Sequence, residues 1–171
     1  MDDLIYNQRR IPTDQWRYGF RSSAATGCGW IATYNAMRLM GYRVDIDDLI
    51  RWYRRIFPLV HGNFGTTTLA PALRFWAWGF PVKVYFRRKH FDAAVENSDV
   101  CILFYYWRQK WKLGAHFVAL RHTPEGILGY NTYKNSAGPD RYGPSLTEFL
   151  KKRRYFGPVL ICIRDKRKQK G

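Results

Sequence analysis

The first half of the chain carries the hydrophobic spacing of helices. From Trp30 to Met40, apolar side chains lie on almost every side of a helical projection, which is typical of a buried helix. Gly41 suits the position just after such a helix. A second helix is expected over residues 45–57, capped by Asp45 or Asp47 and ended by the following proline.

A third helix completes this half. It is expected to start at Thr67 or Thr68, either of which can cap it, to run through Trp76 and to close at Gly79. Residues 62–65, ahead of it, are expected to form a loop. The first half is therefore predicted to be helical.

The second half carries the patterns of strands. Short apolar runs bounded by turn signals predict strands at residues 81–86, 100–106, 116–120, 127–130 and 158–163. Pro124-Glu125-Gly126 predicts a turn, so two of these strands form a hairpin, and residues 109–114 are expected to be a polar turn. Short helices are expected near residues 91–96 and after the capping box Ser145–Glu148. Helices first and antiparallel strands later indicate an α+β fold.

Composition and charge narrow the class of protein. The 171 residues suit one domain, and an aromatic content of 18% excludes an intrinsically disordered chain. Lys and Arg number 29 against 13 Asp and Glu, a formal net charge of +16, and two basic runs at 151–154 and 164–170 stand out. We expect one domain over residues 1–163 and a basic tail over residues 164–171. Nucleic acid, an anionic membrane and an acidic substrate remain open as partners.

The number and spacing of the cysteines argue against several further classes of protein. Cys28, Cys101 and Cys162 have spacings that fit neither a zinc motif nor a Cys-x-x-Cys redox motif, and their odd number argues against a disulfide scaffold. The first residues form no apolar signal region, and no stretch approaches the ~20 apolar residues of a membrane span. We therefore expect a cytoplasmic protein with no metal and no cofactor.

Cys28 is the strongest candidate for chemistry. It lies between Gly27 and Gly29 at the expected start of the buried helix, where a substrate backbone can approach and unpaired N–H groups favour negative charge. Such placement beside a cationic histidine lowers a thiol pKa to roughly 3.5–7.5. An inert buried cysteine is the alternative, and it is the expected state of Cys101 and Cys162 inside their apolar strands.

A cysteine nucleophile needs a histidine that is distant in the sequence but close in the fold. His116 begins an apolar strand, so its ring can leave the sheet toward a cleft while Phe117 and Ala119 face the other way. A buried structural histidine is the alternative. The remaining histidines are expected in a loop (His61), after a basic run (His90) and at a strand end (His122).

Asn131 ends the strand that returns toward His116. The hairpin brings the two residues together, where Asn131 can accept a hydrogen bond from the imidazole N–H and fix its tautomer. Asn135 and Asp140 are weaker substitutes, and an ordinary turn asparagine is the alternative for Asn131 itself.

Four motifs follow one another along the chain: Gly27-Cys28-Gly29 before a helix, Gly65-Thr66-Thr67-Thr68-Leu69 before another, Gly114 to Leu120, and Asn131. Over residues 12–135 this order resembles the papain-like cysteine peptidases of the bacteriocin-processing (double-glycine) peptidase superfamily, a bacterial group. The resemblance implies a papain-like α+β fold. In that fold the nucleophile starts a buried helix in an N-terminal helical part, which packs on a C-terminal antiparallel sheet.

The same resemblance implies roles for individual residues. Cys28 attacks an amide carbonyl, His116 acts first as base and then as acid, and Asn131 orients it. The family places a glutamine ahead of the cysteine to bind the oxyanion, and Gln15 is the counterpart here, with Ser22 a poorer donor nearer the cysteine. The residues expected to contact a peptide substrate are Gly27, Gly29, Trp30, Gly65, Ala115 and Trp111.

Basic and aromatic side chains alternate most densely at Trp107 to Lys112, just ahead of His116. Such a segment suits base stacking in a nucleic acid, an anionic membrane surface, or a rim that selects acidic peptides, and a core strand followed by an exposed turn is the alternative.

Taken with the resemblance, the candidate residues predict a cysteine peptidase or amidase working through a thioester. The alternatives are a catalytically weak or inactive papain-like domain that binds a polyanion through its more basic second half, residues 86–171, and an acyl transferase on the same scaffold.

Overall fold

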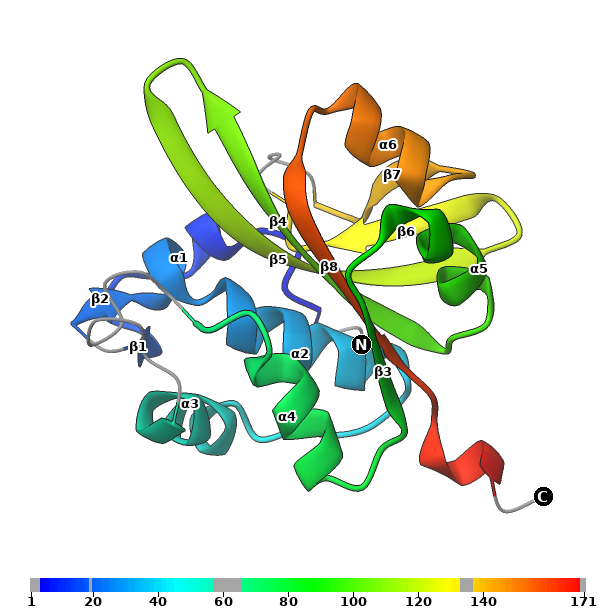
Figure 1. The fold of residues 1–171 in the computed structure, drawn as a ribbon. Helices are drawn as coiled ribbons and strands as arrows, with labels where there is room; N and C mark the ends of the chain where they lie inside the picture. Colours follow the sequence, from blue (N-terminus) through cyan, green and yellow to red (C-terminus); the bar gives the residue numbers. More distant parts are fainter. Residues whose placement is uncertain (1–3, 19, 57–65, 133–136, 170–171) are drawn as a thin grey trace.

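A helical N-terminal part packs against a six-stranded antiparallel sheet in the computed structural model, which describes residues 4–18, 20–56, 66–132 and 137–169 (Figure 1). The helical part contains η1 (Gln8–Arg10), β1 (Arg17–Tyr18), β2 (Arg21–Ser22), α1 (Ser23–Thr26), α2 (Cys28–Leu39), α3 (Ile46–Ile56) and α4 (Ala70–Ala77). The expected α+β class is confirmed.

The sheet has the strand order β3-β8-β4-β5-β6-β7, and every neighbouring pair is antiparallel. Its strands are β3 (Val82–Tyr85), β4 (Val100–Gln109), β5 (Lys112–Thr123), β6 (Gly126–Tyr130), β7 (Asp140–Gly143) and β8 (Phe156–Ile163). Short helical elements accompany them, namely η2 (Arg88–His90), α5 (Phe91–Glu96), α6 (Leu146–Lys152) and η3 (Lys166–Gln169).

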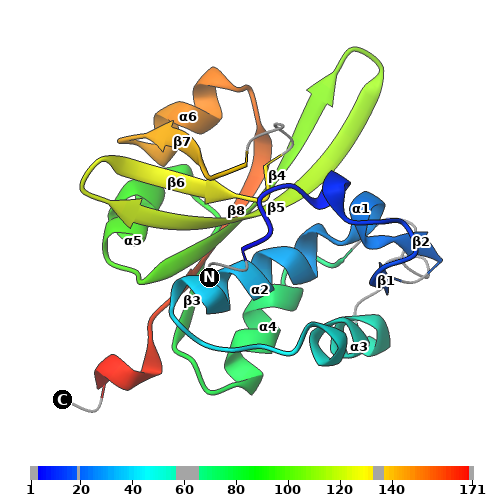
Figure 2. The same cartoon turned by 180° about the vertical axis from the view of Figure 1, so that it is seen from behind.

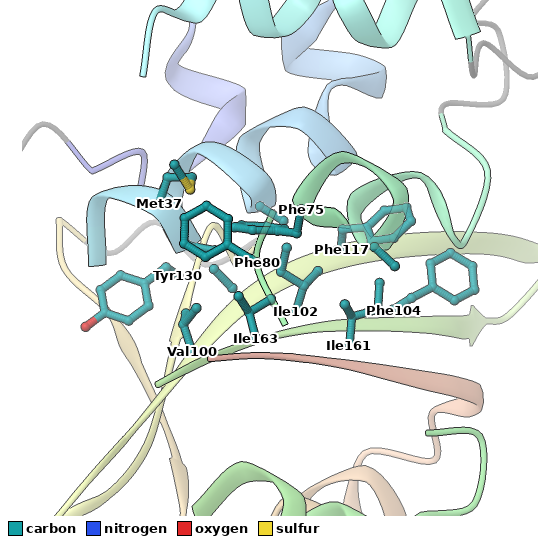
Figure 3. Packing of buried hydrophobic residues seen from close by; sticks show 14 of the residues in the cluster. Met37, Phe75, Phe80, Val100, Ile102, Phe104, Phe117, Tyr130, Ile161 and Ile163 are labelled. Carbon is teal, nitrogen blue, oxygen red and sulfur yellow. The ribbon is translucent and has the colours of Figure 1, made fainter. Parts of the chain in front are cut away.

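Both faces of the central strands are covered, which explains their continuous apolar sequences. Helices α1–α4 lie on one side of the sheet and α5 and α6 on the other (Figures 1 and 2). Along β4 the side chains alternate, so that Ile102 packs with α2 and α4 whereas Leu103 packs with α5 and α6. Figure 3 shows the core on the α2 and α4 side of the sheet, which contains Met37 and Phe75 from the helices together with Phe117 and other strand residues.

The segment expected to be a polar turn, residues 109–114, is mostly strand. β4 and β5 keep pairing as far as Gln109 and Lys112, so only Lys110 and Trp111 make the turn. Lys110 has a φ of 51°, as such tight turns require, and the hairpin extends beyond the body of the sheet (Figures 1 and 2). The polar side chains of residues 109–114 did not end the two strands. A hairpin in solvent can continue its backbone hydrogen bonds without an apolar face.

Helix α4 and strand β7 also differ from expectation. Helix α4 begins at Ala70, after a turn in which the Ala70 N–H bonds the carbonyl of Thr67, and no side chain caps it. Pro71 explains this start, since a proline fits the first helical turn, where its missing N–H costs no hydrogen bond. Strand β7 was not expected because its sequence lacks an apolar alternation.

The segment expected to be a basic tail makes specific contacts as far as Lys168. Arg167 binds the buried Asp165 carboxylate and the Met40 carbonyl, and Lys168 pairs with Asp99. Part of the basic excess therefore balances internal carboxylates. The other run, residues 151–154, is exposed at the end of α6.

No helix in the described part of the chain has the length and apolar character needed to cross a bilayer.

Candidate active site

Cys28 is the first residue of α2, and the packing of that helix determines its place. Cys28, Ala32 and Ala36 follow one another at helical spacing in the core beneath the sheet. The Cys28 side chain is 9% exposed. The backbone N–H groups of Cys28 and Gly29 belong to the first turn, where a helix offers them no internal acceptor.

Burial raises the pKa of the Cys28 thiol to about 11, against the lowered pKa that the sequence suggested. Hydrogen bonds from the backbone N–H groups of Phe117, Gly29 and Cys28 act in the other direction but do not offset the loss of water. Cys28 is therefore a neutral thiol at pH 7. The expected lowering assumed a cationic histidine beside the sulfur, and His116 is not cationic at that pH.

His116 is fully buried, and its Nε2 lies 2.6 Å from the backbone oxygen of Asn131. Because a carbonyl only accepts, Nε2 carries the proton of the neutral ring and Nδ1 does not. Burial lowers the pKa of His116 to about 4, opposed by the bond to Asn131 and assisted by the charge of Arg9. His116 is therefore a neutral, oriented imidazole at physiological pH.

Asn131 meets His116 through its backbone and not through the side chain that the sequence suggested. The Asn131 Oδ1 accepts from the Gln8 backbone N–H at 2.9 Å, and its Nδ2 donates to Gln8 Oε1 at 2.9 Å. Asn131 has a φ of 66°, a left-handed conformation that asparagine tolerates better than most residues. Of the substitutes, Asp140 binds the Thr132 hydroxyl, and Asn135 lies outside the described residues.

Cys28 and His116 lie on elements that pack together, α2 and β5. The Phe117 N–H that faces the sulfur belongs to the peptide group joining His116 to Phe117, so the thiol lies against the backbone of His116. The His116 ring packs edge-on against Tyr105, with ring centroids 6.1 Å apart, while Phe117 joins the core of Cys28. Between these two described residues there is no direct hydrogen bond from the Cys28 sulfur to the His116 ring.

The other histidines do not share this environment. His90 and His122 are exposed, and His61 lies outside the described residues. His116 alone among the described histidines is buried next to the start of α2.

Gln8 is the glutamine that the structure buries at this site. Its Nε2 donates to the carbonyl of Ala24 at 3.1 Å, and its Oε1 binds Asn131. Gln15 instead is exposed and lines a hollow with Arg10 and Trp16. No sequence pattern marks Gln8, because it lies 123 residues from Asn131 and 20 residues ahead of Cys28.

The glycines beside Cys28 serve packing. A Cβ at Gly27 would lie 2.6 Å from the Ser23 carbonyl oxygen and from Nε1 of Trp30, and one at Gly29 would lie 2.8 Å from Thr66. Protein atoms therefore fill the space that the sequence assigned to a substrate backbone. Trp30 itself is fully buried, where its indole N–H binds the Ser23 hydroxyl at 3.1 Å.

The remaining expected contacts with substrate are on the surface or undescribed. Ala115 is exposed on β5, and Trp111, at the tip of the β4–β5 hairpin, is 96% exposed. Gly65 lies outside the described residues, as does Phe57, the expected end of the second helix.

Buried hydroxyl groups near Cys28 were not anticipated. Thr66 Oγ1 donates to the Tyr18 hydroxyl at 2.9 Å, and both residues are buried. Burial raises the pKa of Tyr18, the bond from Thr66 lowers it, and charge repulsion from an ionised Cys28 raises it further. Thr66 lies against Gly29, so this pair of hydroxyl groups lies near the first turn of α2. Isolated tyrosine and threonine residues carry no sequence signal for such a role.

The described residues hold no cluster of three or more His, Cys, Asp or Glu side chains placed to bind a metal ion. The arrangement suits acyl transfer by the protein's own groups: a thiol, an oriented neutral imidazole and helix N-terminal N–H groups.

Comparison with known proteins finds no matching family model and no matching curated protein. Among solved structures, the peptidase domain of Streptococcus ComA matches with a TM-score of 0.54. ComA is described as a bi-functional ABC transporter involved in a quorum-sensing pathway. The sequence identity is 14%, and the match covers 81% of this chain and 91% of that domain. The chain has the fold of a papain-like peptidase domain.

Proposed function

We propose that this protein is a cysteine peptidase or amidase in which Cys28 forms a thioester with the acyl part of its substrate. One observation carries the proposal. The Cys28 thiol at the start of α2 lies against the peptide group that follows His116, whose ring is held by the carbonyl of Asn131. The likeness to the ComA peptidase domain supports it at the level of the fold.

The protonation states determine how the first step runs. Because Cys28 and His116 are both neutral at pH 7, no thiolate–imidazolium pair exists before substrate binds. Nδ1 of His116 takes the thiol proton while the sulfur attacks the amide carbonyl, as in general-base catalysis. The ring packs against Tyr105 in the structure, so this step requires it to turn toward Cys28 when substrate binds.

The later steps return the proton. The imidazolium of His116 protonates the leaving amine as the C–N bond breaks, which leaves a thioester on Cys28. Water then attacks the thioester with His116 as base, and the acid and free thiol are released. In the structure the Asn131 carbonyl accepts from Nε2–H, which leaves Nδ1 as the nitrogen that receives the thiol proton.

The oxyanion needs hydrogen-bond donors near Cys28. The Cys28 backbone N–H is one, because the first turn of α2 leaves it without a helical acceptor. For the side-chain donor we favour the Tyr18 hydroxyl over the exposed Gln15, because Tyr18 is buried and is bonded to Thr66, whose side chain lies against Gly29. Gln8 already donates to Ala24 and instead positions Asn131.

A peptide mixture tests the proposed function because it offers many cleavable sequences at once. Wild type, Cys28→Ala and, as matched control, Cys101→Ala would be incubated with peptides from a digested proteome, and new N-termini would be identified by mass spectrometry. Cleavage by wild type and by the control, absent with Cys28→Ala, is expected. Equal cleavage by all three proteins would exclude Cys28 as nucleophile. An added amine that ends up in the product would identify an acyl transferase instead.

A second candidate function rests on the β4–β5 hairpin. At its tip Trp111 is 96% and Leu113 67% exposed, with Arg108, Lys110 and Lys112 between and beside them. Exposed aromatic and cationic side chains suit an acidic polymer or an acidic peptide. Binding to heparin should weaken steeply with salt and should depend on Lys110 and Lys112 but not on the Cys28 thiol. Unchanged retention of a Lys110→Ala, Lys112→Ala double variant would exclude the hairpin as the site.

A further inference from the structure

The other two cysteines lie side by side on the opposite face of the sheet from Cys28. β4 and β8 pair Cys101 directly with Cys162, and the two sulfur atoms are 3.3 Å apart, with the Cys101 thiol donating. Residues directly opposed on antiparallel strands have Cα atoms about 4.5–5.5 Å apart, within the ~4.4–6.8 Å that disulfides span. The backbone therefore already has the spacing of a cross-strand disulfide.

A cavity of about 650 Å³ reaches one member of this pair. Cys162 contributes to its lining, together with cationic side chains from β3, η2 and the end of β8, namely Lys83, Lys89 and Arg164. Cys162 is 5% exposed and Cys101 1%. Cys162 thus borders a space large enough for a small molecule, whereas Cys101 does not line that space.

The electrostatics distinguish the two thiols in the same order. The pKa of Cys162 is lowered, chiefly by the hydrogen bond from Cys101 and further by the Ser98 hydroxyl, although burial opposes this. Burial raises the pKa of Cys101. Cys162, the thiol at the cavity, is therefore the one that ionises first, and the thiolate is the nucleophilic form.

We propose that Cys162 and Cys101 are the attacking and resolving cysteines of an oxidisable dithiol site whose substrate is a small hydroperoxide admitted by this cavity. The Cys162 thiolate attacks the terminal peroxide oxygen, the O–O bond breaks, and the other oxygen leaves and is protonated to water or an alcohol. This produces a sulfenic acid on Cys162.

The Cys101 sulfur then attacks the Cys162 sulfur. The S–O bond breaks, and hydroxide leaves as water with the proton from Cys101. In sum, two thiols are oxidised to one disulfide, and the hydroperoxide is reduced by two electrons. Cys28 stays a thiol, since it lies on the other face of the sheet with a raised pKa. The proposal does not depend on peptidase activity.

Mass spectrometry of the native protein tests the site. Wild type would be treated with dilute hydrogen peroxide, denatured and alkylated with N-ethylmaleimide. The expected product is lighter than the reduced protein by two hydrogen atoms before alkylation and binds a single maleimide, at Cys28, with a peptide map linking Cys101 to Cys162. Three maleimides after treatment, a disulfide that includes Cys28, or disulfides between molecules would overturn the proposal.

Two variants separate the roles of the pair. In Cys101→Ala, dimedone should trap a sulfenic acid on Cys162, because no resolving thiol remains. In Cys162→Ala, Cys101 should stay unmodified under the same treatment. Trapping on Cys101 but not on Cys162 would reverse the assigned roles and contradict the proposal. The wild-type measurement stands even if either variant fails to fold.

Discussion

Cys28 and Cys162 lie on opposite faces of the sheet, and their pKa values are shifted in opposite directions. Cys28 has a helix N-terminus and three backbone N–H groups around it, yet burial raises its pKa to about 11. Cys162 has a thiol and a hydroxyl as its main donors, yet its pKa is lowered. The comparison shows that a favourable motif does not by itself activate a thiol, because desolvation of the charged form outweighs several weak donors.

This difference separates two kinds of chemistry. A cysteine that is neutral at rest needs a base at the moment of attack, which His116 supplies in the proposed mechanism. A cysteine that ionises more readily needs only access to an oxidant, which the cavity supplies. Variants on the two faces of the sheet test that contrast.

The largest effect is expected from removing the sulfur of Cys28. Cys28→Ala should lower kcat/KM for peptide cleavage by about 10⁵–10⁶-fold, the loss typical of a missing nucleophile. Cys162→Ala is the matched control, since it removes the more acidic thiol from the other face and should leave kcat/KM within a few-fold. Steady-state kinetics on a cleaved peptide measures both. The contrast between the faces fails if Cys162→Ala is the inactive variant.

Removing the proposed oxyanion donor should cost less. Tyr18→Phe is expected to lower kcat by roughly 10²-fold with little change in KM, because a donor aimed at the oxyanion acts in the transition state. Thr66→Val is the matched control, since it removes the same hydrogen bond but keeps the phenol. Gln15→Ala should have almost no effect. A large kcat loss in Gln15→Ala with none in Tyr18→Phe would restore Gln15 as the donor.

The buried His116 predicts a dependence of stability on acid. Its folded pKa of about 4 lies below the ordinary 6.5, so the folded state prefers the neutral ring. The stabilisation that the neutral His116 ring gives to the folded state is therefore complete above pH 6.5. As the pH falls toward 4 it is lost, which lowers the free energy of unfolding by about 3 kcal/mol. Urea unfolding across this range measures it.

His116→Gln should flatten this acid limb, whereas His122→Gln, at an exposed histidine, should leave it unchanged. Cys28 has the complementary effect in alkali. Because its folded pKa is raised from 9.0 to about 11, stability falls as the pH rises between those values. An acid limb that persists in His116→Gln would place the titrating group elsewhere.

A smaller catalytic effect than that of Tyr18→Phe is expected at Asn131. Asn131→Gly keeps the backbone carbonyl that holds His116 and tolerates the left-handed conformation, so kcat should fall less than about tenfold. Stability should fall by about 1–3 kcal/mol, because the two amide hydrogen bonds with the buried Gln8 are lost. A kcat loss as large as that of His116→Gln would show that the side chain, and not the carbonyl, orients the base.

Local sequence patterns predicted those helices and strands whose signals lie within a short stretch of the chain. The apolar run 100–106 is part of β4 and is buried on both faces as far as Tyr105. The expected helix at 91–96 is α5, and Ser145 caps α6 through the Glu148 N–H. The hairpin that brings Asn131 to His116 followed from two strands and one turn. These features depend on residues close together in the sequence, where spacing carries the information.

The rest depends on contacts that spacing does not encode. Gln8 reaches Asn131 across 123 residues, and no local pattern marks it. The pKa of Cys28 depends on how completely Phe117 and the rest of its core exclude water. The sequence placed Cys28 at a helix start correctly, but a helix start is only one of the forces on a thiol.

Direct detection of the acyl-enzyme tests whether Cys28 is the nucleophile. Wild type would be mixed with a cleaved peptide, quenched in acid within the first turnovers, and weighed intact by mass spectrometry. We expect an acyl adduct on Cys28 that hydroxylamine removes, as a thioester requires, and that His116→Gln no longer forms. Peptide cleavage with no such adduct, or an adduct on another residue, would contradict the proposed mechanism.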